Sequence, residues 1–331
     1  MKRFRIKLFT TLSVIISIAT IVCGCGRQTL PVTKTGFAFD TIISVSLYGE
    51  NAENVANELM IEATRLDNLW NKNKSTSDIY KINNSSGNPV EVSPETFFLI
   101  NEAVRFAKES NGAFDPTIGS VTSLWDFKSE EPFIPDEKDI EDALSSVNYK
   151  YILFSENGDN AITITNPKSK IDVGAIAKGY AGDILAKYCY DSGIESGFIN
   201  LGGNVIVLGP KPGSNEPINV GIKNPVPESN DISPYTSIPM YKGCVVTSGL
   251  YERGFKYDGK YYHHILNTKT GYPVKNNLLS VSVIGPSSIT CDALSTILFI
   301  NGIDDGLEFI KNYPEYKIIF IDDELISTIS N

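Results

Sequence analysis

The sequence has few of the residues and motifs that carry metal or redox chemistry in other proteins. It contains five cysteines and two histidines among 331 residues. No two cysteines have the Cys-x-x-Cys spacing of zinc sites and thioredoxin-like centres, which disfavours both classes. The nucleophile elbow Gly-x-Ser-x-Gly, the zinc-protease motif His-Glu-x-x-His and the Walker A motif are also missing.

Basic residues are scarce as well. The chain has 29 Lys and Arg against 39 Asp and Glu, which gives a net charge of −10. Four of the cations lie in the first 24 residues, so their removal leaves about −14 (−10 minus 4). A chain this acidic is a poor candidate for nucleic-acid binding, which needs cations to neutralise phosphates. It can still bind a phosphate-bearing small molecule locally, through a metal ion or a helix end.

The first 24 residues predict a bacterial lipoprotein signal peptide. A basic segment (residues 1–7) precedes an apolar run (residues 8–22), which is too short and too early for an ordinary membrane span. Small residues precede Cys25 as in a lipobox. We therefore expect lipidation at Cys25, a tether over residues 25–35 and one folded domain over residues 36–331, anchored to the cell membrane on its extracytoplasmic side. Plain secretion and a retained signal anchor are the alternatives.

Three cysteines follow this segment: Cys189, Cys244 and Cys291. An odd number in an exported protein predicts at least one buried thiol. We assign no catalytic role to Cys291.

The rest of the chain alternates short strands with a few amphipathic helices. Helices are expected at residues 53–70, 94–109 (with Ser93 as N-cap), 292–300 and 304–313, with another that begins inside 171–183 and ends near Ser192. Strands are expected at residues 37–48, 151–154, 161–165, 196–201, 205–208, 245–247, 254–257, 261–266, 278–284 and 317–321, and loops at 70–87, 112–127 and 225–239. Strands that follow one another through turns predict an α+β fold with mixed, mainly antiparallel sheets flanked by helices.

The segment from Ile171 to Asp183 has the pattern of a strand that turns into a helix. It reads Ile-Asp-Val-Gly-Ala-Ile-Ala-Lys-Gly-Tyr-Ala-Gly-Asp. A helix that begins after Gly174 would offer unpaired N–H groups and the cation of Lys178 to a phosphate. Asp172 could cap this helix or accept hydrogen bonds from a ligand. An ordinary strand-to-helix joint is the alternative.

Asp292 and Thr296 are four residues apart in an expected helix and therefore share one face. A carboxylate and a hydroxyl are hard oxygen ligands, which suit Mg²⁺ or Ca²⁺. The alternative is that Asp292 caps the helix and Thr296 bonds back to a carbonyl. His263 and His264 are the only histidines, and strand alternation predicts one in the core and one toward solvent. Either could act as a general base beside a phosphoryl group, and a structural role is the alternative for each.

Six segments, in this order, resemble the FAD:protein FMN transferase family of ApbE-type flavin transferases. They are Gly-Ala-Phe-Asp-Pro at 112–116, Asp-Val-Gly-Ala-Ile-Ala-Lys-Gly-Tyr at 172–180, Asn-Leu-Gly-Gly at 200–203, Thr-Ser-Gly-Leu-Tyr-Glu-Arg at 247–253, His-Ile-Leu-Asn-Thr-Lys-Thr-Gly at 264–271 and Asp-Ala-Leu-Ser-Thr at 292–296. The resemblance extends from about Phe37 to Gly302. It implies a T-fold-related flavin transferase domain.

The resemblance also implies a set of site residues. Those that would contact FAD are Ala113, Phe114, Asp115, Asp172, Lys178 and Leu266. Those that would bind Mg²⁺ are Ala175 (through its carbonyl), Asp292 and Thr296, while His264 would assist catalysis.

Three positions depart from the family pattern. The usual Met-Gly-Thr opening is Phe39-Asp40-Thr41, and a tyrosine near the flavin falls at about Asn73. We keep Phe39 and Asn73 as candidate FAD contacts, with Trp70 as an alternative stacking residue. The usual His-Ile-Ile/Val-Asp run ends in Asn267, which leaves that position without an assigned role.

The chemistry implied by the resemblance is Mg²⁺-dependent attack of a Ser or Thr hydroxyl of an acceptor protein on the FMN phosphorus of FAD, with release of AMP. His264 or a nearby carboxylate would take the proton. The acceptor motif resembles Ser/Thr-Gly-Ala-Ser/Thr, which this chain lacks, so the chain would be the enzyme and an extracytoplasmic redox protein its acceptor. The alternatives are an FAD pyrophosphatase that yields FMN and AMP, and a non-catalytic flavin-binding lipoprotein.

Overall fold

The computed structural model describes residues 30–129, 131–226 and 233–330. The predicted signal peptide and Cys25 lie outside these ranges. Within them, none of the helices combines the length and the apolar character that crossing a bilayer requires. The predicted tether ends too late, because residues 32–35 already belong to strand β1 (Val32–Ala38).

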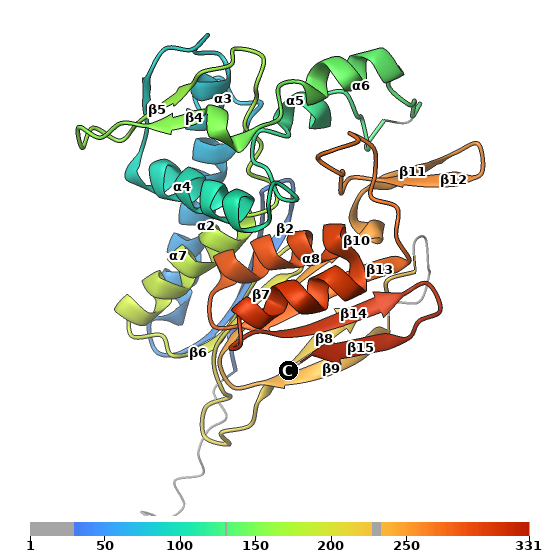
Figure 1. Cartoon of the computed structure of the whole chain (residues 1–331). Helices are drawn as coiled ribbons and strands as arrows, with labels where there is room; N and C mark the ends of the chain where they lie inside the picture. The colour runs from blue at the N-terminus through green and yellow to red at the C-terminus, as the bar shows by residue number, and fades with distance from the viewer. Residues whose placement is uncertain (1–29, 130, 227–232, 331) are drawn as a thin grey trace, which may run out of the picture.

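A large antiparallel sheet forms the base of the described structure (Figure 1). Its strands in spatial order are β1, β2 (Thr41–Tyr48), β6 (Ser196–Leu201), β7 (Asn204–Gly209), β10 (Gly243–Gly249), β13 (Leu278–Gly285), β14 (Lys317–Asp322) and β15 (Ser327–Ser330). The alternation predicted for the first strands is present, since Ile43, Val45 and Leu47 of β2 are buried. This sheet and its helices confirm the predicted α+β class.

The predicted single strand over residues 37–48 is wrong, because it is a hairpin of β1 and β2. The chain turns at Phe39 and Asp40, whose φ angles of 53° and 63° are left-handed. Glycine, asparagine or aspartate normally marks such a turn. Asp40 fits this preference but Phe39 does not, so the sequence gives only a weak turn signal.

Three long helices cover one face of the sheet: α2 (Ala52–Trp70), α7 (Ala177–Asp191) and α8 (Ser288–Phe309). The α2 helix buries Val55, Leu59 and Leu66 at helical spacing, as predicted. At Gly302 the α8 helix bends, because this residue has a non-helical φ of 77°. The two predicted helices over 292–313 are therefore both present, and a short 3₁₀ turn, η3 (Ile310–Asn312), follows them.

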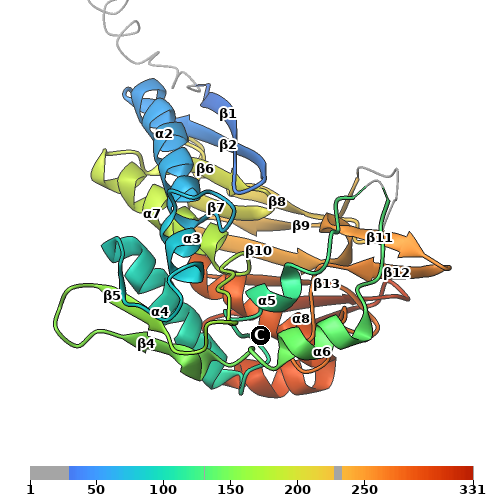
Figure 2. The same cartoon turned by 90° about the horizontal axis from the view of Figure 1, so that it is seen from above.

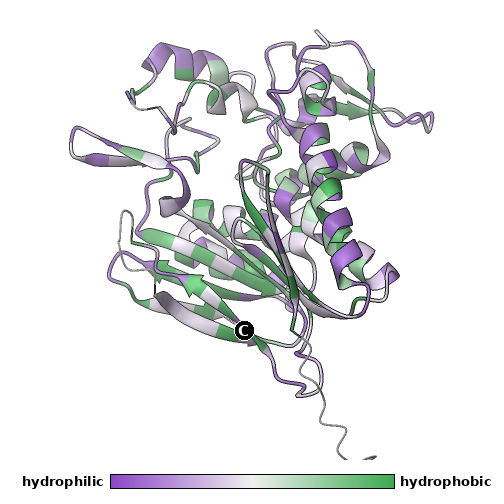
Figure 3. Cartoon of the chain, turned by 180° about the vertical axis from the view of Figure 1, so that it is seen from behind, coloured by the Kyte–Doolittle hydropathy of each residue, from purple (hydrophilic) through white to green (hydrophobic). Residues whose placement is uncertain are grey.

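A hairpin of β8 (Ile218–Lys223) and β9 (Pro234–Met240) packs on the opposite face of the sheet (Figure 3). Its apolar residues, such as Val220 and Ile222, contact Val207 and Val245 of the sheet. The loop predicted over residues 225–239 is therefore wrong from residue 234 onward. Prolines are tolerated in a two-stranded hairpin because both strands have a free edge.

The helix α4 (Pro94–Glu109) and several short elements form a further layer above the three long helices (Figures 1 and 2). Its helices are α3 (Asp78–Asn83), α4, α5 (Gly119–Thr122), α6 (Glu137–Leu144), η1 (Tyr149–Tyr151) and η2 (Leu250–Glu252). Its strands are β3 (Val90–Glu91), β4 (Ile152–Phe154), β5 (Ala161–Ile164), β11 (Gly254–Tyr257) and β12 (Lys260–His263).

Only α4 of these helices was predicted, and its Ser93 cap is confirmed. The short α3 and α5 lie where loops were expected, because a helix of one or two turns buries too few residues to show a periodic pattern. β12 also ends at residue 263, before the predicted end at 266.

Candidate active site

The junction of α7 and α8 brings the two most informative segments together. Asp183 of α7 accepts hydrogen bonds from the backbone N–H groups of Ser288 (2.8 Å) and Ile289 (3.0 Å), and so caps α8 from outside. Gly179 faces the same end of α8, where a Cβ would lie 2.5 Å from the Ser288 carbonyl oxygen. Only glycine permits this approach. It lets the Gly179 N–H donate to Oδ2 of Asp292 at 2.7 Å.

The Ala175 carbonyl lies just before α7. Gly179 is the third residue of that helix, so its N–H has no carbonyl partner within the helix and donates to Asp292. Ala175 precedes the N-cap Ile176, and its carbonyl accepts no hydrogen bond from the described residues. Sequence analysis expected Asp292 to bind a metal or to cap a helix. The cap is wrong, since Asp292 lies inside α8 and Ser287 is the N-cap.

The predicted metal ligands fit a hard cation. Asp292 has a second carboxylate oxygen without a partner among the described residues, and the Thr296 hydroxyl lies 3.3 Å from Ser248 Oγ. With the Ala175 carbonyl they form a set of carboxylate, hydroxyl and carbonyl oxygens, which suits Mg²⁺. No group of three His, Cys, Asp or Glu side chains gathers in the described ranges. The predicted set contains only one residue of these types.

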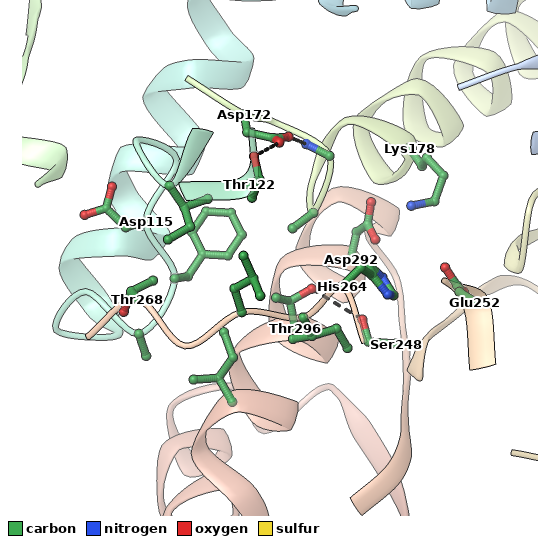
Figure 4. Close-up of a pocket in the computed structure, with 18 of the residues that line it drawn as sticks. Asp115, Thr122, Asp172, Lys178, Ser248, Glu252, His264, Thr268, Asp292 and Thr296 are labelled. Atoms are coloured by element: carbon green, nitrogen blue, oxygen red, sulfur yellow. Dashed lines mark hydrogen bonds between the residues drawn. The ribbon is translucent and has the colours of Figure 1, made fainter. Parts of the chain in front are cut away.

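Ten of the twelve residues predicted for the site line one cavity, here called the central cavity (Figure 4). They are Ala113, Phe114, Asp115, Asp172, Ala175, Lys178, His264, Leu266, Asp292 and Thr296. Segments from across the chain therefore meet as the sequence predicted. The cavity has a volume of about 160 Å³. Typical ligand pockets measure roughly 300–1,000 Å³, so a dinucleotide would also occupy space outside it.

The Asp115 carboxylate stabilises a turn and does not face the cavity. It accepts hydrogen bonds from the N–H (2.8 Å) and hydroxyl (2.6 Å) of Thr117 and from the Tyr149 N–H (2.9 Å). Burial raises the pKa of Asp115, and these hydrogen bonds oppose that shift. In Figure 4 its carboxylate points away from the other labelled groups.

Asp172 is held by a lysine that the sequence did not indicate. Its carboxylate accepts from Lys72 Nζ (2.6 Å), the Thr122 hydroxyl (2.8 Å) and the Gly174 N–H (2.9 Å). Burial alone would raise the pKa of Asp172, but the Lys72 charge and these hydrogen bonds outweigh it and lower the pKa below its ordinary value. Asp172 does not cap α7, because Ile176 occupies that position. Lys72 and Asp172 are 100 residues apart, so no local pattern could reveal the pair.

The two histidines differ in their surroundings, largely as predicted. His263 is buried, its Nδ1 accepts from the Ile265 N–H (3.3 Å), and its Nε2 therefore donates to the Val274 carbonyl (3.0 Å). Burial lowers the pKa of His263 to about 4. His264 is half-buried and lines the central cavity.

The ring of His264 is oriented by a backbone carbonyl. Its Nδ1 lies 3.2 Å from the Arg253 carbonyl oxygen, an acceptor, so Nδ1 carries the proton. Its Nε2 then keeps a free lone pair. Burial lowers the pKa of His264 to about 3, with a further contribution from the charge of Arg253. The imidazole is therefore neutral and can accept a proton.

Glu252, on η2, is the main cavity residue to which sequence analysis gave no role. It lies near Lys178 and Asp292 in Figure 4. The Glu252 side chain is exposed, but desolvation of its carboxylate by the surrounding protein raises its pKa. The positive charge of Lys178 opposes this shift, and the negative charge of Asp292 adds to it. The only sequence signal was its place in the segment 247–253.

Phe39 and Asn73 lie outside the central cavity. Phe39 packs on Trp70, with ring centroids 6.2 Å apart, and lines a second cavity with Thr41 and Lys223, here called the side cavity. Asn73 is exposed in the loop after α2 and lines a different cavity. The alternative stacking residue Trp70 is 3% exposed and belongs to the core.

Asn267 has a structural role in the turn after β12. Its Oδ1 accepts from the backbone N–H groups of Lys269 (2.9 Å) and Thr270 (3.2 Å). Asparagine commonly stabilises turns in this way.

The fold and this arrangement of segments are those of the ApbE family, to which the chain belongs. The model of that family matches residues 39–320. A relative from Klebsiella pneumoniae (strain 342), named FAD:protein FMN transferase, is 32% identical over 280 residues, which cover 84% of this chain and 85% of the relative. A relative of the same name from Treponema pallidum (strain Nichols) is 27% identical over 315 residues, which cover 90% and 86%.

Solved structures agree with this assignment. The ApbE protein from Thermotoga maritima has a TM-score of 0.82 and 32% identity, over 91% of this chain and 96% of that one. The flavin transferase ApbE from Vibrio cholerae has a TM-score of 0.77 over 91% and 96%, and its 22% identity supports the fold alone. The predicted family, the fold class and the prediction of a transferase are confirmed.

Proposed function

We propose that this chain transfers FMN from FAD to a Ser or Thr hydroxyl of an acceptor protein and releases AMP in a Mg²⁺-dependent reaction. The observation that carries the proposal is the 2.7 Å contact between Gly179 and Asp292. It joins Asp292 to the start of α7, where Ala175, Lys178, Asp292 and Thr296 line one cavity. The names of the relatives support the choice of substrate.

The residues of the cavity suit attack on a diphosphate. Bound by Ala175, Asp292 and Thr296, Mg²⁺ would neutralise charge on the phosphates. The cation of Lys178 lies near Asp292 in the same cavity (Figure 4). The acceptor oxygen forms a bond to the FMN phosphorus. The bond from that phosphorus to the bridging oxygen breaks, and AMP leaves with the electron pair.

The proton of the acceptor hydroxyl goes to a neighbouring base. His264 is suited to this because its Nε2 has a free lone pair while Nδ1 is held by the Arg253 carbonyl. The low pKa of His264 would rise beside an anionic diphosphate, because an adjacent negative charge favours the imidazolium. Glu252 is the second candidate base, since its carboxylate lines the same cavity.

We further propose that residues 1–24 are a signal peptide, that Cys25 is lipidated, and that the domain acts outside the cytoplasm on a redox protein. The support is the sequence of the N-terminal segment. The mass of the purified chain tests it. A mass without residues 1–24 and with a diacylglyceryl group on Cys25 is expected, and an intact N-terminus contradicts it.

The transfer is tested with the full chain in mild detergent, FAD, Mg²⁺ and a protein that carries a Ser/Thr-Gly-Ala-Ser/Thr segment. An acceptor mass increase of one FMN, together with free AMP, supports the proposal. Free FMN and AMP with an unmodified acceptor indicate a pyrophosphatase. Intact FAD throughout indicates binding without catalysis, and either result overturns the proposal.

A further inference from the structure

The side cavity adjoins the central cavity and shares part of its lining. Lys178, Thr247 and Glu252 line both cavities. The side cavity is the larger of the two, with a volume of about 410 Å³ against about 160 Å³. A group that enters through it therefore reaches Lys178 and Glu252 from the side opposite the turn at 113–115.

Part of the side cavity is walled by residues without side chains. Gly202, Gly203 and Gly221 all line it. An added Cβ at Gly202 or Gly221 would meet Thr41 or Pro234, whereas at Gly203 it would meet only the Glu252 carboxylate, 3.8 Å away. At Gly203 the backbone itself therefore forms the wall, and an extended segment that carries a Ser or Thr hydroxyl can lie close against it.

An exposed apolar pair lies beside the side cavity. Phe37 of β1 and Ile42 of β2 are directly opposite each other, and each is 69% exposed. Residues two apart on a strand share a face, so Ile42 lies on the same face as Ser44, which pairs with Asn200 of β6. Asn200 lines the side cavity. The apolar pair and the cavity therefore occupy the same face of the sheet, side by side.

We propose that the acceptor protein docks on the Phe37–Ile42 pair and that its hydroxyl-bearing segment runs through the side cavity to Lys178 and Glu252. This docking surface rests on the transfer proposed above. Two exposed side chains and a narrow cavity offer too little area for a stable dimer, which buries well over 1,000 Å². They suit the brief contact of an enzyme with a protein substrate.

The test compares a docking variant with a matched control in the full chain. The double variant Phe37→Ser, Ile42→Thr removes the apolar pair, and Ile61→Ser removes an apolar side chain on α2 that is 62% exposed. With FAD and Mg²⁺ saturating and a motif-bearing acceptor varied, we expect the KM for the acceptor to rise about tenfold in the double variant. We expect kcat and the Kd for FAD to stay within about twofold. Ile61→Ser should match the wild type in all three.

A second measurement does not depend on these substitutions. A photo-crosslinking amino acid at position 42 should couple to the acceptor, and the same group at position 61 should not. An unchanged KM in the double variant, a crosslink only to a second copy of the chain, or a loss of FAD affinity would each overturn the docking surface; the last would assign this face to FAD. If the wild-type protein leaves the acceptor unmodified, the proposed function is wrong as well. If the wild type and the double variant both transfer FMN with the same KM for the acceptor, only the docking surface is wrong.

Discussion

The turn at 112–117 and the junction of α7 and α8 use carboxylates in opposite ways. At the turn, both oxygens of Asp115 are occupied, by Thr117 and Tyr149. At the junction, the Asp292 carboxylate accepts one hydrogen bond from the residues that the structure describes, that of Gly179, and keeps an oxygen toward the central cavity. A carboxylate whose two oxygens both accept hydrogen bonds, here called saturated, stabilises the backbone around it. A carboxylate with an oxygen left over, here called unsaturated, is available to a ligand. Both residues belong to segments that resemble the family, so resemblance alone does not separate the two roles.

Adjacent histidines repeat this contrast. Both ring nitrogens of His263 are hydrogen-bonded in the core, so this residue stabilises the fold. His264 has one nitrogen bonded to the Arg253 carbonyl, and the other has no partner in the described part of the chain and lies beside the cavity. Substitutions at saturated groups should therefore change stability, and those at unsaturated groups should change turnover.

The largest expected effect is that of Asp292→Asn. The amide oxygen can still accept from the Gly179 N–H, but the charge that would hold Mg²⁺ is lost. We expect kcat for flavin transfer to fall about a thousandfold, since a metal site supplies several kcal/mol of transition-state stabilisation. The free energy of unfolding should change by less than about 1 kcal/mol. Acceptor modification and urea denaturation measure the two quantities.

Asp183→Asn is the matched control, because Asp183 is a saturated carboxylate on the neighbouring helix. It should lower stability by about 1–2 kcal/mol, as the loss of a helix cap does, and leave more turnover than Asp292→Asn. Turnover of Asp292→Asn within tenfold of the wild type would contradict the metal assignment.

The pH dependence of stability should follow His263. Its pKa of about 4 in the folded chain lies below the ordinary 6.5, so the unfolded chain takes up the proton first as the pH falls. The contribution of His263 to the free energy of unfolding is fully present above pH 6.5. It is lost progressively as the pH falls toward 4, by about 3 kcal/mol in all. Urea denaturation across this pH range should show the loss in the wild type and a smaller loss in His263→Gln.

His264→Gln provides the comparison for that measurement. Its ring is half-buried and reachable by water from the cavity, so its contribution to the pH dependence should be smaller than that of His263. Equal slopes for the two variants would remove the distinction between the histidines.

Asp115→Asn should lower the free energy of unfolding by about 2 kcal/mol. The substitution removes a charged acceptor and turns an amide N–H₂ toward donors that need an acceptor. The Kd for FAD of the folded protein should stay within about threefold, because the carboxylate does not face the cavity. Chemical denaturation and flavin fluorescence titration measure these effects. A tenfold loss of FAD affinity at unchanged stability would return Asp115 to the role that the family resemblance implied.

The sequence was informative where a pattern is local. The cap at Ser93, the spacing in α2 and the alternation in β2 all come from neighbouring residues. The β1–β2 turn was missed because Phe39 is not a typical turn residue and Asp40 alone is a weak signal. The β9 strand was missed because its prolines suggest a loop, although a two-stranded hairpin tolerates them.

The site was predictable only as a set of positions. Sequence resemblance implied that Ala175 is a ligand, but its place beside Asp292 depends on a hydrogen bond between Gly179 and Asp292, 113 residues apart. Such contacts depend on how α7 packs on α8, which no local pattern encodes. Lys72 was missed for the same reason.

Lys72→Met should have the smallest effect of these substitutions. It tests Asp172, whose carboxylate is saturated with hydrogen bonds although it lines the central cavity. Lys72 and Asp172 are partly exposed, with side chains 29% and 22% accessible, so their ion pair should contribute less than about 1 kcal/mol to stability. The lowered pKa of Asp172 supports stability above about pH 4, and that support is lost as the pH falls. Without Lys72 the folded-state pKa of Asp172 should rise, so this loss at acid pH should become smaller, and the KM for FAD should rise about threefold because Asp172 is less well held. Lys74→Met removes a lysine that pairs with Asp67 on α2 (2.8 Å) and should leave the KM unchanged. If both variants gave the same KM, Asp172 would belong with Asp115 among the carboxylates that only hold backbone.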